Sequence, residues 1–170
     1  MDLKEYIKTV EDFPKPGVSF KDIAPLVASP SALKEVVRQI KAKIDMRTID
    51  KIVGFDARGF LFGPLLSVEC NIPFVMLRKK GKLPGKCTGV KYDLEYGSNE
   101  LELQINAISK GDKVLLIDDL LATGGTAKAG CQLVEQVGGV VECVVFIVEL
   151  SFLEGRDKLK DVNVISLIEY

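Results

Sequence analysis

Five short apolar runs constrain the fold of this chain more than any other feature, and each of them is followed directly by a charged residue. They occupy residues 51–55, 72–77, 114–117, 143–148 and 162–168. Runs without apolar–polar alternation are typical of strands that are covered on both faces, as in a parallel sheet. Stretches with helical character lie between them. The sequence therefore predicts an α/β fold, with a central, mainly parallel sheet flanked by helices.

The helices are predicted from caps and from the spacing of apolar residues. Ser29 followed by Pro30 marks a helix start, because serine caps a helix and proline suits its first position. One face of that helix would carry Leu33, Val36, Val37, Ile40 and Ile44. Further helices are expected at about 2–10, 58–70 and 126–137. Prolines and glycine make the rest of the first 25 residues read as irregular structure.

Composition narrows the classes of function. The 170 residues suit a single domain, 1–170, and the net charge of −1 argues against a nucleic-acid partner. The chain has no histidine, which excludes Ser-His-Asp, Cys-His and HExxH chemistry. Four scattered cysteines form no zinc or disulfide signature. Without a signal-like start or ~18 consecutive apolar residues, we expect no membrane partner and a cytoplasmic location.

Residues 114–126 contain the most informative pattern. A buried strand is expected to end at Asp118 and Asp119, and a turn of small residues then leads into a helix. Parallel sheets bind ligands beyond the carboxyl ends of their strands, and a helix N-terminus attracts phosphate. The turn lacks the GxxxxGK[ST] and GxGxxG motifs. Carboxylates beside a phosphate suit a ligand with hydroxyls, such as a ribose 5-phosphate. The alternative is a structural turn in which one acid merely caps the helix.

Residues 78–100 interrupt the α/β pattern with six cations and four glycines. A long basic, glycine-rich insertion in a small domain is expected to be a functional lid or a loop without fixed structure. A solvated hairpin is the alternative.

The segment Asp-Asp-Leu-Leu-Ala-Thr-Gly-Gly-Thr at 118–126 resembles the phosphoribosyl diphosphate (PRPP) motif of type I phosphoribosyltransferases. Its Leu-Leu-Ala-Thr form is similar to the branch of that family that uses adenine. Other matches follow in order, at 13–23, 54–64, 78–85, 94–97, 148–150 and 155–159. The resemblance implies the type I phosphoribosyltransferase fold, with a small N-terminal hood at about 1–28 and a flexible basic lid at about 78–100.

The same resemblance implies roles for individual residues around PRPP. Asp118 and Asp119 would bind the ribose hydroxyls, and Arg58, in the loop 56–59, would face the diphosphate and assist catalysis. A cis non-proline peptide is expected near Ala57–Arg58. The 5-phosphate would be held by Ala122, Thr123, Gly124, Gly125 and Thr126. An ordinary solvated arginine is the alternative for Arg58, although a helix start disfavours a cation.

The lid and the hood would complete the implied site. Glu95 would be the catalytic acid or base, with a plain surface glutamate as the alternative. The diphosphate would also be bound by Arg78, Lys82, Tyr96 and, less directly, Lys79. Adenine would be bound by Ser19, Phe20, Lys21 and Leu150. Phe20 could instead be a core residue. Relatives commonly carry arginine where this chain has Lys21 and an apolar residue in place of Ser19.

The reaction implied by the resemblance joins adenine and PRPP to give AMP and diphosphate in purine salvage. Mg²⁺ would be the cofactor, carried by PRPP rather than by direct protein ligands. A homodimer is implied as well, paired through the face near the diphosphate loop. Two alternatives stay open: a regulator that senses PRPP without transferring it, and a transferase for a 6-oxo purine or a pyrimidine.

Overall fold

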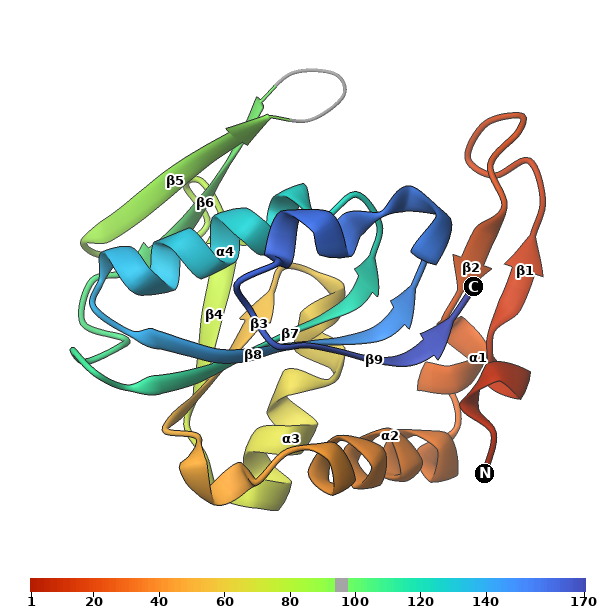
Figure 1. The fold of residues 1–170 in the computed structure, drawn as a ribbon, viewed down its shortest axis with the longest axis horizontal. Helices are drawn as coiled ribbons and strands as arrows, with labels where there is room; N and C mark the ends of the chain where they lie inside the picture. The colour runs from red at the N-terminus through yellow and green to blue at the C-terminus, as the bar shows by residue number, and fades with distance from the viewer. Residues whose placement is uncertain (94–97) are drawn as a thin grey trace.

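A seven-stranded sheet runs through the computed structural model, which describes residues 1–93 and 98–170 (Figure 1). The strand order is β5-β6-β4-β3-β7-β8-β9. The last five strands in this order are parallel to one another: β4 (Phe74–Lys79), β3 (Lys51–Phe55), β7 (Lys113–Leu121), β8 (Val140–Glu149) and β9 (Val164–Glu169). The predicted parallel sheet is therefore confirmed, and its carboxyl ends share one edge.

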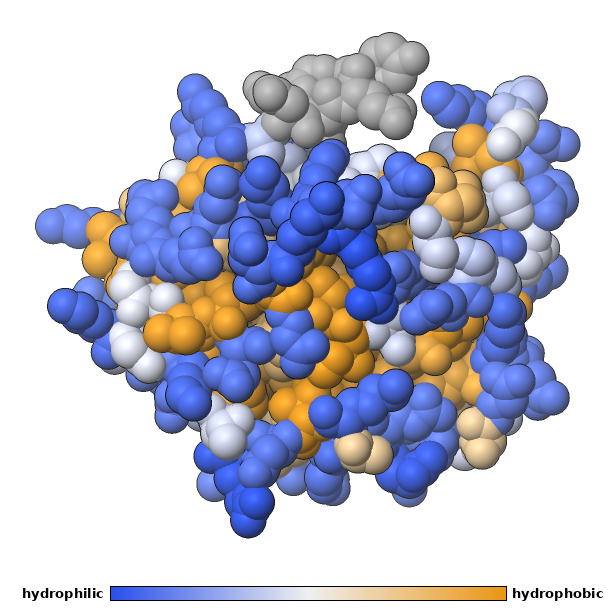
Figure 2. All heavy atoms as spheres, viewed as in Figure 1, coloured by the Kyte–Doolittle hydropathy of each residue, from blue (hydrophilic) through white to orange (hydrophobic). Residues whose placement is uncertain are grey.

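Helices cover both faces of this sheet, as the unalternating apolar runs require (Figure 1). On one side lie α2 (Pro30–Lys43) and α3 (Gly63–Cys70), and on the other lies α4 (Gly125–Gln136). Leu115 and Ile117 of β7 face the first side, while Val114 and Leu116 face the second. Figure 2 shows hydrophilic residues (blue) over both helical layers and a band of hydrophobic residues (orange) between them.

Local signals placed α2 and α4 correctly, since the helix predicted at 126–137 is found at Gly125–Gln136. The hydroxyl of Ser29 accepts a hydrogen bond from the Ala32 backbone N at 3.3 Å, and Pro30 is the first residue of α2. The predicted helix at 58–70 is divided, because Phe62 separates the 3₁₀ turn η3 (Arg58–Leu61) from α3. Within the described ranges, no helix combines the length and apolar character that crossing a bilayer would need.

The N-terminal region differs most from expectation. A short 3₁₀ turn, η1 (Leu3–Tyr6), replaces the predicted helix, and residues 8–10 form strand β1. β1 (Lys8–Val10) pairs antiparallel with β2 (Phe20–Asp22), so the region expected to be irregular is a hairpin. It is followed by the single-turn helix α1 (Ala24–Val27). Three-residue strands carry too little local pattern to be recognised; the pairing across residues 11–19 creates them.

The basic insertion is an antiparallel hairpin in its described part. β5 (Cys87–Asp93) pairs with β6 (Ser98–Gln104), and β6 also pairs with the end of β4. Residues 94–97, at the tip, lie outside the described residues. The remaining short elements are 3₁₀ turns: η2 (Met46–Thr48), η4 (Ser151–Leu153) and η5 (Gly155–Leu159).

Candidate active site

The candidate site lies where β3, β7 and β8 end side by side, with the β1–β2 hairpin at one flank (Figure 1). The acid pair, Asp118 and Asp119, was predicted to end its strand, but β7 continues beyond it to Leu121. Leu120 and Leu121 continue the ladder, opposite Val148 and Glu149 of β8. The pairing with a longer neighbour extends the strand through the carboxylates, so the turn starts at Ala122.

The turn at 122–126 has the geometry of an anion cradle. Gly124 adopts a positive φ of 78° and caps α4, whose twelve residues start at Gly125. The first turn of α4 carries no acidic side chain, so its backbone N–H groups and the positive end of the helix dipole meet no local carboxylate. Thr123 is exposed and Thr126 is half-buried. The structure thus brings all five predicted phosphate residues to the start of one helix.

Asp118 and Asp119 form a buried pair of like charges. Asp119 is 3% exposed, and its backbone N donates to the Asp118 carboxylate at 2.8 Å. Burial and the neighbouring Asp119 charge raise the pKa of Asp118 well above its usual value. Burial also raises the pKa of Asp119, against the lowering effect of Arg58. In the free protein, therefore, their hydrogen bonds and Arg58 do not offset the burial of these two carboxyl groups.

Arg58 reaches the acid pair from the loop after β3. Its Nε lies 2.9 Å from Oδ2 of Asp119, and its guanidinium carbon lies 6.0 Å from the Phe20 ring centroid. Gly59 makes this approach possible, because a Cβ there would lie 2.5 Å from the Ile117 carbonyl oxygen. The cis peptide joins Asp56 to Ala57, one peptide earlier than predicted.

The base of segment 78–100 is tied to the same loop. Arg78 Nε donates to Asp56 Oδ2 at 2.9 Å, and Arg78 Nη1 donates to the Lys82 carbonyl at 3.2 Å. Lys79 and Lys82 are exposed. The proposed catalytic residue Glu95 and its neighbour Tyr96 lie outside the described residues.

The β1–β2 hairpin presents an aromatic surface near Arg58. Phe20 is half-buried, lies outside both cores and packs edge-on against Phe13, with ring centroids 5.1 Å apart. Ser19 donates to Glu11 at 3.1 Å. Lys21 donates to the Thr9 hydroxyl at 3.0 Å and stacks 4.3 Å above the Tyr170 ring. Leu150 is half-buried and donates its backbone N to the Leu121 carbonyl at 2.9 Å.

Comparison with known proteins agrees with this geometry. Residues 24–168 match the model of the phosphoribosyl transferase domain family. The chain belongs to this family. A curated adenine phosphoribosyltransferase of Christiangramia forsetii is 51% identical over 171 residues, which cover 100% of this chain and 99% of the relative.

Solved structures of the phosphoribosyl transferase family have the same fold. Adenine phosphoribosyltransferase from Thermoanaerobacter pseudethanolicus gives a TM-score of 0.95 at 42% identity, covering 99% of this chain and 98% of that one. The Saccharomyces cerevisiae enzyme, in complex with an imino-altritol bisphosphate and adenine, gives 0.93 at 40% identity, covering 97% and 96%. The type I phosphoribosyltransferase fold expected from the motifs is confirmed.

One cluster in this phosphoribosyl transferase was not assigned a role from sequence. Glu149, Arg156 and Ser166 bond to one another beside the phosphate turn. Glu149 and Arg156 lie in the matched segments 148–150 and 155–159, which was the available signal. Ser166 belongs to β9, and no local pattern connects it to the other two.

Proposed function

We propose that this chain transfers the 5-phosphoribosyl group from PRPP to adenine, giving AMP and diphosphate in purine salvage. The observation that carries the proposal is the position of two carboxyl groups, whose pKa values burial raises, directly before the glycine turn at the start of α4. A ribose 5-phosphate matches both, since it offers hydroxyls to the acids and a phosphate to the turn. The adenine phosphoribosyltransferase names of the relatives support the same reaction.

In the proposed complex, the diphosphate of PRPP lies over the loop 56–59. Arg58 would move from Asp119 to the diphosphate. The ribose hydroxyls would then donate hydrogen bonds to Asp118 and Asp119. Arg78 and Lys82 would neutralise charge on the leaving group from segment 78–100, with Lys79 nearby, and Tyr96 would donate a hydrogen bond to it. Displacement at C1 of the ribose passes through an oxocarbenium-like state, which is favoured by neutralising the departing charge and excluding water.

We propose that Mg²⁺ binds with PRPP. Among residues 1–93 and 98–170, no three potential ligands gather into a metal site. The carboxylates present, Asp118 and Asp119, suit hydroxyls or a substrate-borne cation. Mg²⁺ prefers substrate phosphates and waters to an all-protein cage, so this donor set fits it. When bound, the ion would offset part of the diphosphate charge.

We propose that the hood, residues 1–28, recognises adenine. Phe20 would stack on the purine, and the backbone of Ser19 and Lys21 would read its edge, while Leu150 packs on the other side. A backbone carbonyl can accept a hydrogen bond from the exocyclic amine at position 6 of adenine. A 6-oxo purine has an oxygen at that position, which cannot donate. Glu95 would accept the proton that the purine nitrogen loses when it bonds to C1 of the ribose. The yeast relative, solved with adenine, supports this base.

The direct experiment is AMP formation from the purified protein, PRPP and Mg²⁺ with adenine, run beside hypoxanthine, guanine and uracil. We expect product from adenine alone. Tight PRPP binding without product from any base would instead indicate a PRPP sensor. Glu95→Gln should lower kcat far more than it changes PRPP affinity; an unchanged kcat would remove Glu95 from the reaction.

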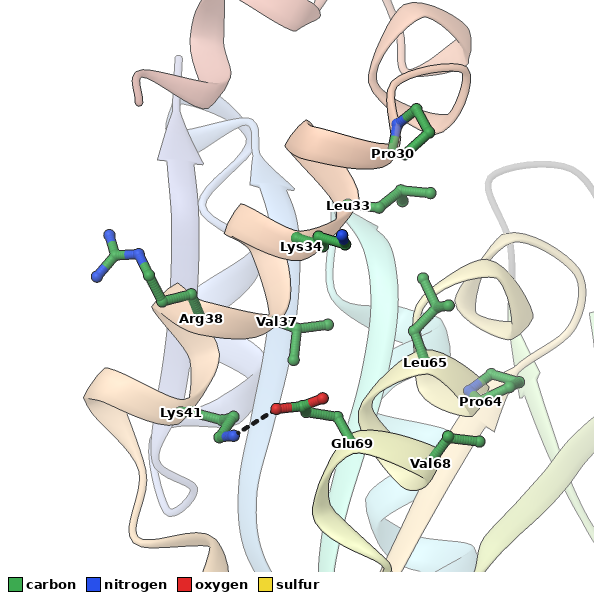
Figure 3. Close-up of a pocket in the computed structure, with 10 residues that line it drawn as sticks. All are labelled: Pro30, Leu33, Lys34, Val37, Arg38, Lys41, Pro64, Leu65, Val68 and Glu69. Atoms are coloured by element: carbon green, nitrogen blue, oxygen red, sulfur yellow. Dashed lines mark hydrogen bonds and ion pairs between the residues drawn. The ribbon is translucent and has the colours of Figure 1, made fainter.

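We further propose a homodimer that pairs through the groove between α2 and α3. This groove measures about 780 Å³ and is lined by apolar side chains that include Leu33, Leu65 and Val68, as Figure 3 shows. Val68 is 84% exposed, and Leu65 is 39% exposed. A second copy would cover these residues. Light scattering should report a dimer, and Val68→Asp should shift it towards monomer.

The compartment is also part of the proposal. Cys70, Cys87, Cys131 and Cys143 are all free thiols. Unpaired cysteines are typical of proteins in a reducing compartment, which favours the cytoplasm.

A further inference from the structure

A buried carboxylate lies next to the phosphate turn without belonging to it. Glu149 ends β8 and is 4% exposed. Arg156 donates to both of its oxygens, from Nε to Oε1 and from Nη2 to Oε2, each at 2.7 Å. Ser166 Oγ also donates to Oε2 through a short hydrogen bond. A bidentate arginine pair of this kind fixes orientation as well as charge.

Arg156 also joins its own turn, η5, to the edge of the sheet. Its Nη1 donates to the Val164 carbonyl at 3.0 Å, so one guanidinium connects η5 to β8 and β9. The residue before it, Gly155, is buried and starts η5. Whatever holds Arg156 therefore also sets the position of the Gly155 backbone.

The Gly155 backbone presses directly on the phosphate turn. A Cβ placed on Gly155 would collide with the Ala122 carbonyl oxygen, and one placed on Gly124 would collide with the Gly155 carbonyl oxygen. Such contact between two backbones leaves little room for either segment to shift. The turn at 122–124 therefore takes its position partly from η5.

We infer that Arg156 is a positioning residue for the 5-phosphate: its pairing with Glu149 holds Gly155 against residues 122–124 and so fixes the N–H groups at the start of α4. Arg156 acts through Gly155 and touches no substrate. The inference rests on the proposed function, because that function supplies the phosphate. It predicts that loosening the pair weakens phosphate binding while leaving the adenine surface of the hood unchanged.

The test compares Arg156→Met with Arg47→Met. Arg47 makes a bidentate pair with Asp45, at 2.9 and 2.8 Å, in the η2 turn before β3 and away from the strand ends. Each variant loses one bidentate arginine–carboxylate pair, and Arg156→Met also loses a longer ion pair with Glu169, at 3.7 Å. Calorimetry would measure affinity for ribose 5-phosphate and AMP, and steady-state assays would measure KM for PRPP and for adenine. All measurements use a temperature at which circular dichroism shows folded protein.

For Arg156→Met, we expect affinity for both phosphates to fall by about tenfold or more, since small displacements of positioning groups have large effects. The KM for PRPP should rise in parallel, and that for adenine should stay within about twofold. Arg156→Lys keeps the charge and should recover part of the loss. If Arg156→Met fails to fold, Ser166→Ala, which removes one donor to Glu149, should show a smaller loss in the same direction.

Unchanged ribose 5-phosphate affinity in the folded variants would overturn the inference, even if they melt at a lower temperature. An equal loss in Arg47→Met would overturn it as well. Failure of the proposed function looks different, because the unmodified protein would then form no AMP. Ribose 5-phosphate binding reports on the turn in either case.

Discussion

Two arginine–carboxylate pairs lie at neighbouring strand ends of this molecule and match closely in burial. In the pair Arg58–Asp119 and in the pair Arg156–Glu149, the arginine side chain is 43% exposed and the carboxylate 5% exposed. The shortest nitrogen–oxygen distances are 2.9 and 2.7 Å. Burial and distance alone would assign both pairs the same role.

Their hydrogen bonding and charge differ. Burial raises the pKa of Glu149, but the hydrogen bonds from Arg156 and Ser166 outweigh burial, and the net pKa is lowered. Burial raises the net pKa of Asp119, although Arg58 and the hydrogen bond with Asp118 lower it. Hydrogen bonds therefore offset the burial of Glu149, but they do not offset the burial of the acid pair of β7 in the free protein. An acid pair that is incompletely stabilised in this way is suited to bind a ligand.

The largest effect should come from neutralising the acid pair. We expect the double variant Asp118→Asn and Asp119→Asn to lose PRPP binding by on the order of 100-fold or more, because both acceptors for the ribose hydroxyls lose their charge. Calorimetry with PRPP measures the affinity. Asp161→Asn, which removes an exposed carboxylate before β9, is the control and should bind normally. Undiminished affinity in the double variant would make the acid pair structural and end the contrast.

Removing the charge of Glu149 should mainly affect stability. Glu149→Gln removes the buried charge that Arg156 pairs with and leaves it the more distant Glu169 carboxylate, at 3.7 Å. Breaking one side of a buried pair destabilises strongly. We expect a loss of about 3 kcal/mol in the free energy of unfolding at pH 7, at the low end for such pairs because Arg156 is half exposed. Urea titration followed by circular dichroism measures it.

The loss in Glu149→Gln should depend on pH. The folded pKa lies below the ordinary 4.5, so the charged form contributes its stability above that value. The contribution is lost as pH falls through the folded pKa, and the variant and the unmodified protein should then converge. A gap that stays constant down to pH 3 would show that charge is not its source.

Asp118→Asn should shift stability the other way. The asparagine oxygen still accepts from the Asp119 backbone N, while the repulsion between carboxylates is removed. We expect the variant to be more stable at pH 7 by about 1 kcal/mol, as at other sites that trade stability for function. Since the folded pKa of Asp118 is raised, its cost is present above that pKa and absent below the unfolded pKa, so the gain should vanish in acid. If Asp118→Asn were less stable than the unmodified protein at pH 7, the charged Asp118 carboxylate would not be a cost to the free protein.

The sequence predicted those parts of the fold that local pattern determines. The apolar runs predicted the parallel strands, and Ser29 with Pro30 predicted the start of α2. The hairpin β1–β2 was missed because its three-residue strands form only by pairing with each other across residues 11–19. The extension of β7 through Asp118 and Asp119 was missed for the same reason, since its ladder with β8 overrides the charged residues.

The site shows the same division. Residues 118–126 are contiguous, so strand, acids, glycines and helix start could be recognised together. Arg58 was expected to face the diphosphate, and the sequence did not predict that it pairs with Asp119 in the free protein. Glu149, Arg156 and Ser166 come from three elements, and only folding brings them into contact. Sequence therefore pointed to the candidate ligand-facing groups, whose roles stay predictions, and missed the three groups that pack beside them.

The smallest effect should come from a contact that joins the hood to the Glu149 edge. Tyr170 donates its backbone N to the Glu149 carbonyl at 3.0 Å, and Lys4 and Lys21 each lie 4.3 Å from its ring centroid. A cation–π contact at a partly exposed site contributes about 0.5–1 kcal/mol. Tyr170→Leu should therefore raise the KM for adenine by about two- to fivefold, by freeing Lys21, and leave the KM for PRPP unchanged.

Lys4→Met is the matched control for Tyr170→Leu, because it removes a cation from the same ring and keeps Lys21 in place. It should leave both KM values unchanged. If Tyr170→Leu raised the KM for PRPP instead, the hood would be coupled to the phosphate turn through the Glu149 edge. The Arg156–Glu149 pair would then influence the binding of both adenine and phosphate. Its role could no longer be separated from that of the acid pair Asp118–Asp119.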